Sequence, residues 1–216
     1  MNKGELRAHL IALLNRSDCT NALADTFIDQ AVSRITRVLR IPPMEKTQTY
    51  QISDIQNNSW NVSFINLPAD LLETIDIYST AGTSAPKAGH ALKRVPLHEM
   101  VEMQATGQSG TAQFFTRQQS TFLLHPNPDT GTIVVNYYGA FPELTSDSST
   151  NTLTTLGPDC LIYTALSYAA DYFLDERAPQ FDTKASAFLS EIQEQADSAE
   201  QAGSLQVMRP SSMYID

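Results

Sequence analysis

The chain has 216 residues, of which 42% are hydrophobic, and a formal net charge of −10. This length is enough for one sizeable hydrophobic core, or for a small helical layer joined to a small sheet. No run reaches the roughly 18 consecutive apolar residues that a transmembrane helix needs. We therefore expect no membrane partner, and a protein that is made and kept in the cytoplasm.

The negative charge is concentrated toward the C-terminus. Residues 140–216 hold twelve acidic and three basic side chains, a net charge of −9, whereas residues 1–40 hold four acidic and six basic ones. Binding of nucleic acid without sequence preference requires clustered cations. The charge argues against a nucleic-acid-binding module. It is compatible with a surface past which nucleic acid slides, or with solubility alone.

The first segment, residues 1–43, predicts two helices. The apolar stripe of the first helix, residues 4–15, is formed by Leu6, Leu10, Leu13 and Leu14. A second helix follows to about Arg40, because apolar residues recur there at spacings of three and four. Pro42 and Pro43 then end it.

Residues 44–144 change from a helical period to a period of two, which predicts a β-rich insertion. The expected strands are Thr47–Ile52, Trp60–Ile65, Thr74–Ser79, Leu92–Val95, Gln113–Arg117, Thr121–Leu124 and Thr132–Tyr138. Turn residues at Asn127–Gly131 predict that the last two strands form a β-hairpin. Pro96–Met103 predicts a short helix.

The C-terminal part returns to the helical period. Residues 145–156 are polar and predict an exposed linker. Residues 157–203 predict two helices, one opened by Pro158 and one opened by Pro179. Neither terminal helix pair has enough apolar surface to fold alone, so we expect an α+β fold. In it, the N- and C-terminal helices form one bundle and the antiparallel β-rich region is inserted between them.

The last segment, residues 204–216, is too apolar for a solvated end and too short to fold alone. Its apolar side chains are Leu205, Val207, Met208, Met213, Tyr214 and Ile215. The segment either binds a partner as an extended arm or folds back on its own subunit.

No motif for catalysis, cofactor binding or metal binding occurs in the sequence. The four histidines, at positions 9, 90, 98 and 125, form no metal-ligand pattern, and the nine glycines form no phosphate-binding loop. Cys19 and Cys160 belong to no CxxC motif and predict packed, reduced thiols. We therefore predict no cofactor, no metal and no enzyme activity, unless a site is assembled only in three dimensions.

Two tyrosines predict a protein interface. Tyr168 and Tyr172 are four residues apart and share one helix face, away from the apolar stripe. Tyrosine contributes a large contact area at low entropic cost. We predict a subunit interface formed by these tyrosines with Arg34 and Arg37. The alternative is that the rings contact the protein's own sheet.

Four segments give the chain a characteristic order. They are LPADLLETIDIYS (Leu67–Ser79), RVPLHEM (Arg94–Met100), LLHPNPDTGTIVVNYYGAFPEL (Leu123–Leu144) and GPDCLIYTALSYAADYFLDE (Gly157–Glu176). With this order the chain resembles the head-to-tail adaptor proteins of tailed bacteriophages, over most of its length. The resemblance implies a non-enzymatic virion protein in the neck between capsid and tail.

The same resemblance implies partners. It predicts a ring of twelve copies beneath the portal protein, a tail nozzle or tail tube protein below, and DNA that passes through the channel without specific binding. It also implies that residues 204–216 are a portal-binding arm. The alternatives are a neck or tail-completion protein of a different fold, and a small enzyme with a dispersed site.

Overall fold

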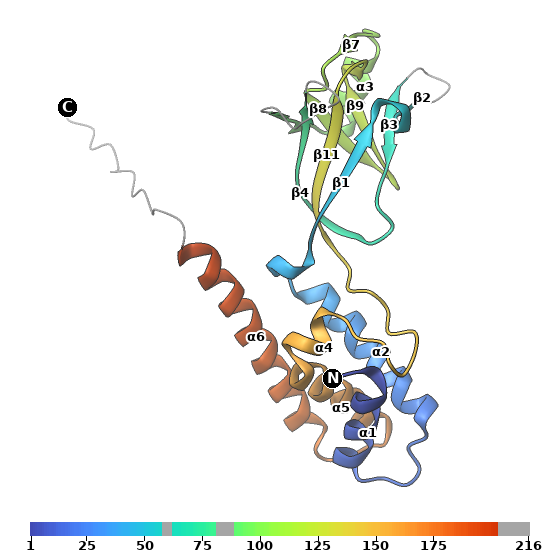
Figure 1. Cartoon of the computed structure of the whole chain (residues 1–216), viewed down its shortest axis with the longest axis vertical. Helices are drawn as coiled ribbons and strands as arrows, with labels where there is room; N and C mark the ends of the chain where they lie inside the picture. Colours follow the sequence, from blue (N-terminus) through green and yellow to red (C-terminus); the bar gives the residue numbers. More distant parts are fainter. Residues whose placement is uncertain (58–61, 81–88, 203–216) are drawn as a thin grey trace, which may run out of the picture. The chain divides into compact units, whose positions relative to one another are not determined.

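The computed structural model describes residues 1–57, 62–80 and 89–202. These residues form two compact units (Figure 1). The helical unit combines Met1–Pro43 with Phe141–Asp216, and the β unit is Met44–Ala140. Helices at both ends of the chain and a β-rich middle with antiparallel sheets confirm the predicted α+β class.

The helical unit is built around one central helix. Its helices are α1 (Lys3–Leu14), α2 (Asn21–Val38), α4 (Thr152–Leu156), α5 (Pro158–Tyr172) and α6 (Ala178–Ala202). Helix α5 packs against each of the other four. It buries small side chains on several sides, among them Cys160, Ala165 and Ala169, and small side chains let neighbouring helices approach closely. The helices from the two ends of the chain therefore share one core, as predicted.

Local signals place the ends of these helices. Asn2 and Glu5 form a reciprocal capping box at the start of α1. The Thr20 side chain accepts a hydrogen bond from the Leu23 N–H group at the start of α2. Pro158 lies in the first turn of α5, where its missing N–H group costs no hydrogen bond.

The β unit contains two main sheets and one short helix. Its strands are β1 (Glu45–Gln51), β2 (Gln56–Asn57), β3 (Ser63–Asn66), β4 (Leu71–Thr80), β5 (His90–Ala91), β6 (Lys93–Arg94), β7 (Ser109–Gly110), β8 (Phe114–Gln118), β9 (Thr121–His125), β10 (Asn127–Pro128) and β11 (Thr132–Gly139). One sheet has the order β1-β11-β4-β5 and the other β2-β3-β9-β8-β6, while β7 and β10 form a small parallel pair. The short helix is α3 (Leu97–Gln104), which confirms the helix expected there. The 3₁₀ turn η2 (Ile52–Asp54) follows β1, and the 3₁₀ turn η1 (Pro42–Met44) spans the boundary between the two units in the chain.

Strand β9 is buried on both of its faces. Phe122 and Leu124 join the main core, together with side chains from both sheets such as Ile77 and Ile133. Leu123 points to the other face, where it packs with Met100 of α3. This alternation follows from the period of two in a strand, and it places α3 over the sheet that contains β9.

The predicted hairpin at Asn127–Gly131 is wrong. Strand β9 pairs with β3 and β8, whereas β11 pairs with β1 and β4 in the other sheet. The turn residues therefore carry the chain from one sheet to the other. The hairpin that does form joins β8 to β9 through Gln119, whose φ of 53° lies in the left-handed region.

Residues 145–150 are largely exposed, as expected of a linker, but residues 151–156 form the partly buried helix α4 and its cap. Backbone carbonyls of Asp147 and Ser149 accept hydrogen bonds from the first N–H groups of α1, at 2.9 and 3.0 Å. Asn151 and Thr154 are buried and form the capping box of α4. The segment is polar because it satisfies helix ends, whose first N–H groups have no partner within the helix.

Candidate functional site: protein-binding surfaces

Ionisable groups do not converge on a reactive site in the part of the chain that the structure describes. No group of three histidine, cysteine or acidic side chains is placed there to hold a metal ion. His125 is buried on β9, and burial lowers its pKa, which favours the neutral ring. The other three histidines lie exposed on α1, β5 and α3.

The two cysteines are free and buried in the helical unit. Burial raises the pKa of Cys19, and it raises the pKa of Cys160 to about 11. Both thiols are therefore protonated at neutral pH, and a protonated thiol is a poor nucleophile. They pack as small apolar groups.

One charged cluster in the β unit connects strand ends through hydrogen bonds. Lys46 on β1 and Tyr137 on β11 both donate hydrogen bonds to the Asp70 carboxylate, at 2.5 and 3.1 Å. Burial by itself raises the pKa of Asp70, but these two hydrogen bonds outweigh it and leave that pKa lowered. Burial and the bond to Asp70 raise the pKa of Tyr137 to about 12. The three groups satisfy one another, so we assign them a structural role.

The four residues that were predicted as a subunit interface lie along helices α2 and α5. The Arg34 guanidinium forms an ion pair with Asp182 of α6 at 2.6 Å, and Arg37 is exposed one turn further along α2. Tyr168 is half-buried, and Tyr172 is 61% exposed. Whether they contact another subunit stays a prediction.

Tyr172 contacts aromatic neighbours within the helical unit. Its ring lies 5.7 Å from Phe27 of α2 and 4.9 Å from Phe173, measured between centroids. The Arg16 guanidinium lies 4.5 Å from the centroid of the Phe173 ring. These contacts use part of the Tyr172 ring and leave the rest open to a partner.

The turn after α5 presents an apolar residue that sequence reasoning missed. Leu174 is 90% exposed and has a φ of 53°. A helix end with this backbone conformation usually carries glycine. The sequence has no glycine between Phe173 and Arg177, so a residue with a side chain had to take the left-handed position at this helix end.

A groove of about 420 Å³ lies between α2 and α6 in the same unit. Leu39 and Leu189 are buried in it, and Val38 at its side is 59% exposed. The Gln193 side-chain amide accepts from the N–H group of Arg40 and donates to its carbonyl, both at 3.0 Å. These bonds and the Arg34 ion pair hold the two helices at a fixed spacing, so the groove is already formed in the free subunit.

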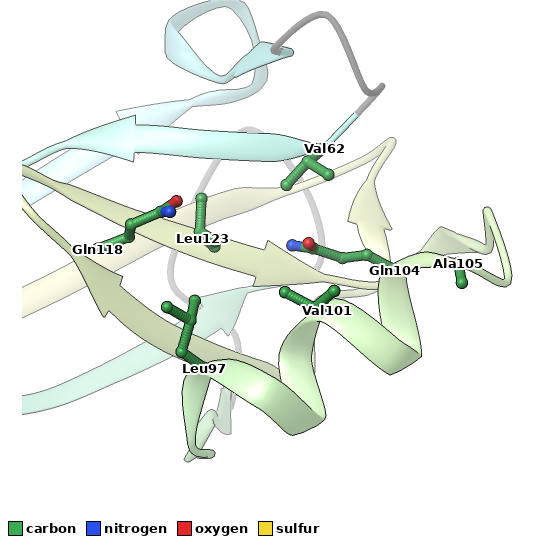
Figure 2. A pocket seen from close by; sticks show the side chains of 7 residues that line it. All are labelled: Val62, Leu97, Val101, Gln104, Ala105, Gln118 and Leu123. Carbon is green, nitrogen blue, oxygen red and sulfur yellow. The ribbon is translucent and has the colours of Figure 1, made fainter.

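The β unit has an apolar hollow of its own, between α3 and β9 (Figure 2). Its volume is about 370 Å³. Leu97 and Val101 of α3 face Leu123 and Val62 across it, and both α3 side chains are largely exposed. The side-chain nitrogen of Gln104, at the end of α3, is buried there without a hydrogen-bond partner. Mostly apolar walls, with the two amide side chains of Gln104 and Gln118, suit contact with protein better than catalysis.

The predicted portal-binding residues lie outside the described part of the chain. They are Leu205, Val207, Met208, Met213, Tyr214 and Ile215. No helix within the described residues has both the length and the apolar character needed to cross a membrane.

Comparison with known proteins supports the interpretation that the groove and the hollow are protein-binding surfaces. No curated protein matches the sequence. Residues 1–210 match the model of a family described as SU10 adaptor protein. Because the match spans nearly the whole chain, the protein belongs to the SU10 adaptor protein family and is a structural adaptor of a bacteriophage.

Proposed function

We propose that the protein forms a ring beneath the portal of a tailed phage, connects the portal to the next tail component and surrounds the DNA exit channel. The observation that carries this proposal is the family match over residues 1–210. The role is structural and not catalytic, and its place is the neck of the virion. In the host cell the protein is held in the cytoplasm until assembly.

Exposed apolar side chains in the helical unit support self-association. Val38, Tyr172 and Leu174 are each more than half exposed, and the α2–α6 groove is open. Large apolar side chains that are exposed together beside a groove usually mark a protein-binding site. A ring of identical subunits covers such groups without a second protein.

The charge supports a channel through which DNA moves freely. Helix α6 exposes Asp182, Glu191, Glu194 and Asp197. Like charge keeps a phosphate backbone from adhering to such a surface. The net charge of −9 over residues 140–216 gives the same expectation for the C-terminal part as a whole.

The test is assembly with the purified portal protein, observed by negative-stain electron microscopy. We expect closed rings on the portal, with one central hole. A mixture in which the chain neither binds the portal nor closes into rings contradicts the proposal. Detection of an enzymatic turnover with no portal-dependent assembly favours the enzyme alternative instead.

The C-terminal segment is the proposed contact with the portal. Deletion of Met208–Asp216 should weaken portal attachment and leave the helical circular dichroism intact, because the helices that the structure describes all lie within residues 3–202. As a matched control, a full-length chain with Met213, Tyr214 and Ile215 each replaced by serine keeps the length and loses only the apolar anchors. Loss of folding on deletion shows instead that the segment belongs to the subunit's own core.

A further inference from the structure

We infer that the exposed Leu174 side chain of one copy inserts into the α2–α6 groove of the next copy, and that this contact links neighbouring subunits. The inference rests on the proposed ring and names the residues that join it. It uses two features of the helical unit that packing within the subunit does not explain, the exposed Leu174 side chain and the open α2–α6 groove.

Leu174 is held rigidly in a conformation that its side chain disfavours. The Asp175 N–H group donates to the Ala170 carbonyl at 2.8 Å, and the Leu174 N–H group donates to the Asp171 carbonyl at 3.1 Å. These two bonds form a Schellman motif in which Leu174 takes the left-handed position. Glycine would fill this position without strain, so the backbone geometry does not explain a leucine.

The turn is also fixed to the rest of the unit. The Arg177 side chain pairs with Asp175 at 2.6 Å and donates a hydrogen bond to the Leu14 carbonyl, at the end of α1, at 3.0 Å. The Leu174 side chain is therefore presented to solvent from an ordered turn. Because the backbone of the turn is ordered before contact, only the side-chain rotamers of Leu174 lose conformational entropy when it binds.

The groove cannot receive Leu174 of its own chain. Leu174 precedes the start of α6 at Ala178, and the groove is centred near Ser190 on the same helix. At 1.5 Å per residue these points lie roughly 18 Å apart along the rigid helix. A second copy is the occupant that the chain itself supplies, since every copy carries both the side chain and the groove.

The chemistry of the two partners matches. Leu39 and Leu189 form an apolar floor and Val38 an apolar side, while polar groups such as Gln193 and Glu194 stand at the rim. An apolar centre inside a polar rim is the usual anatomy of a protein interface.

Two guanidinium groups beside the contact are already paired within the subunit. The Arg177 guanidinium near Leu174 is paired with Asp175, and the Arg34 guanidinium in the groove is paired with Asp182. An unpaired buried charge would oppose the contact, and these pairs avoid it.

A contact between two different patches has a defined consequence for assembly. It is head-to-tail, so each copy offers one free Leu174 and one free groove to further copies. Such a contact gives a closed ring when the rotation between copies closes. Arg34, which was predicted as an interface residue, lines the groove, and Tyr172 lies two residues before Leu174.

Two variants test the contact in the full chain. Leu174→Gly removes the side chain and supplies the residue that the turn prefers, so the melting temperature should stay unchanged or rise. Val38→Glu places a charge at the side of the groove. Each variant alone should lose at least tenfold in self-association, measured by sedimentation velocity over a concentration series and by ring counts on the portal.

Matched controls separate the contact from general effects. Gln119→Gly relieves the same backbone conformation in the β8–β9 hairpin. Leu156→Glu adds the same charge at an apolar residue of α4 that is exposed to a similar extent, 51% against 59% for Val38. Both controls should assemble as the wild type does.

Mixing the two variants gives the decisive outcome. The Val38→Glu chain keeps its Leu174 and the Leu174→Gly chain keeps its groove, so a mixture should form one-to-one dimers that cannot extend. Wild-type assembly by Leu174→Gly overturns the inference while the ring itself stands. Absence of any wild-type self-association, alone or on the portal, overturns both.

One competing occupant is visible in the same assay. If deletion of Met208–Asp216 removes the effect of Val38→Glu on assembly and no mixed dimer forms, the groove belongs to the C-terminal segment, and the inference fails.

Discussion

The two asparagine caps of the helical unit offer a controlled measure of what burial adds to a capping box. Asn2 caps α1 and Asn151 caps α4, and in both motifs the side-chain oxygen accepts from the backbone N–H group three residues later, at 2.8 and 2.9 Å. The α1 bonds are exposed, whereas the α4 bonds are buried. Asn151 also donates from Nδ2 to the Pro142 carbonyl at 3.0 Å.

Alanine at each position should give clearly different losses of stability. Asn2→Ala should cost about 0.5–1 kcal/mol, because water replaces the lost cap. Asn151→Ala should cost about 2–4 kcal/mol, since the same cap is lost and the buried Thr154 N–H group has no water to replace it. Urea titration followed by circular dichroism at 222 nm measures both, since helices dominate that signal.

Aspartate at the same two positions should separate the cap from the extra hydrogen bond. Asn2→Asp keeps the acceptor and adds a negative charge at a helix N-terminus, so stability should change little or rise. Asn151→Asp keeps the acceptor but loses the donor to Pro142 and buries a carboxylate, so stability should fall. Equal losses for the two alanine variants, or a neutral Asn151→Asp, would refute the reasoning that residues 145–156 are a structural part of the core.

Two further predictions concern the Lys46–Asp70–Tyr137 cluster. The pKa of Asp70 is lower in the folded than in the unfolded state, so its ionised carboxylate stabilises the fold. This contribution to the free energy of unfolding is fully present above the unfolded pKa near 3.8 and is lost as pH falls through the folded pKa. Acid titration followed by intrinsic fluorescence should show this loss of stability in the wild type and not in Asp70→Asn. Gly139→Ala should destabilise by about 1–3 kcal/mol, because its Cβ would lie 2.7 Å from Lys46 Cδ and 2.8 Å from Asp70 Oδ2. Thermal melts check the second prediction. Part of the loss should disappear in a Lys46→Ala background, because the contact with Asp70 remains there, and an unchanged loss would show that Lys46 does not contribute to the clash.

Hydrophobic periodicity was a reliable guide to the helices. Leu6, Leu10 and Leu14 are each buried, as their spacing of four predicts, whereas Leu13, which was also expected on the stripe, is exposed. The two helices of residues 157–203 were also expected, and α5 begins at Pro158 as its turn residues indicated. Periodicity succeeds here because each helix buries one continuous stripe against α5.

Strand partners could not be predicted in the same way. The turn at Asn127–Gly131 has hairpin chemistry, yet β9 and β11 belong to different sheets. Turn residues report only the local direction of the chain, and the pairing of β11 with β1 depends on residues more than eighty positions away. Ile133 and Val134 are buried in succession on β11, which shows a central strand and not one arm of an isolated hairpin.

The hydrogen-bonding role of the polar segment before α4 could not be predicted for a related reason. A stretch such as Ser146–Ser149 has no apolar period, so composition assigns it to solvent. In the folded unit its carbonyls satisfy the N-terminus of α1, and the Leu144 carbonyl just before it accepts from the buried Lys3 ammonium at 2.9 Å. Hydrogen-bond demand at a helix end is set by tertiary position, which composition does not record.

Leu174 shows where local rules and the fold disagree most sharply. Among the described residues other than glycine, it shares a positive φ with Asn15 and Gln119. Asparagine tolerates that conformation, and Gln119 turns a tight hairpin, but a leucine gains nothing from it within the subunit. The run Tyr172-Phe173-Leu174 would place all three side chains in a core by composition, yet the fold leaves Leu174 almost fully in solvent. Sequences tend to break local rules at positions that serve a function. A strained, exposed leucine in an otherwise consistent helix end is therefore best explained by a demand from outside the subunit, and the subunit's own stability would be served by glycine.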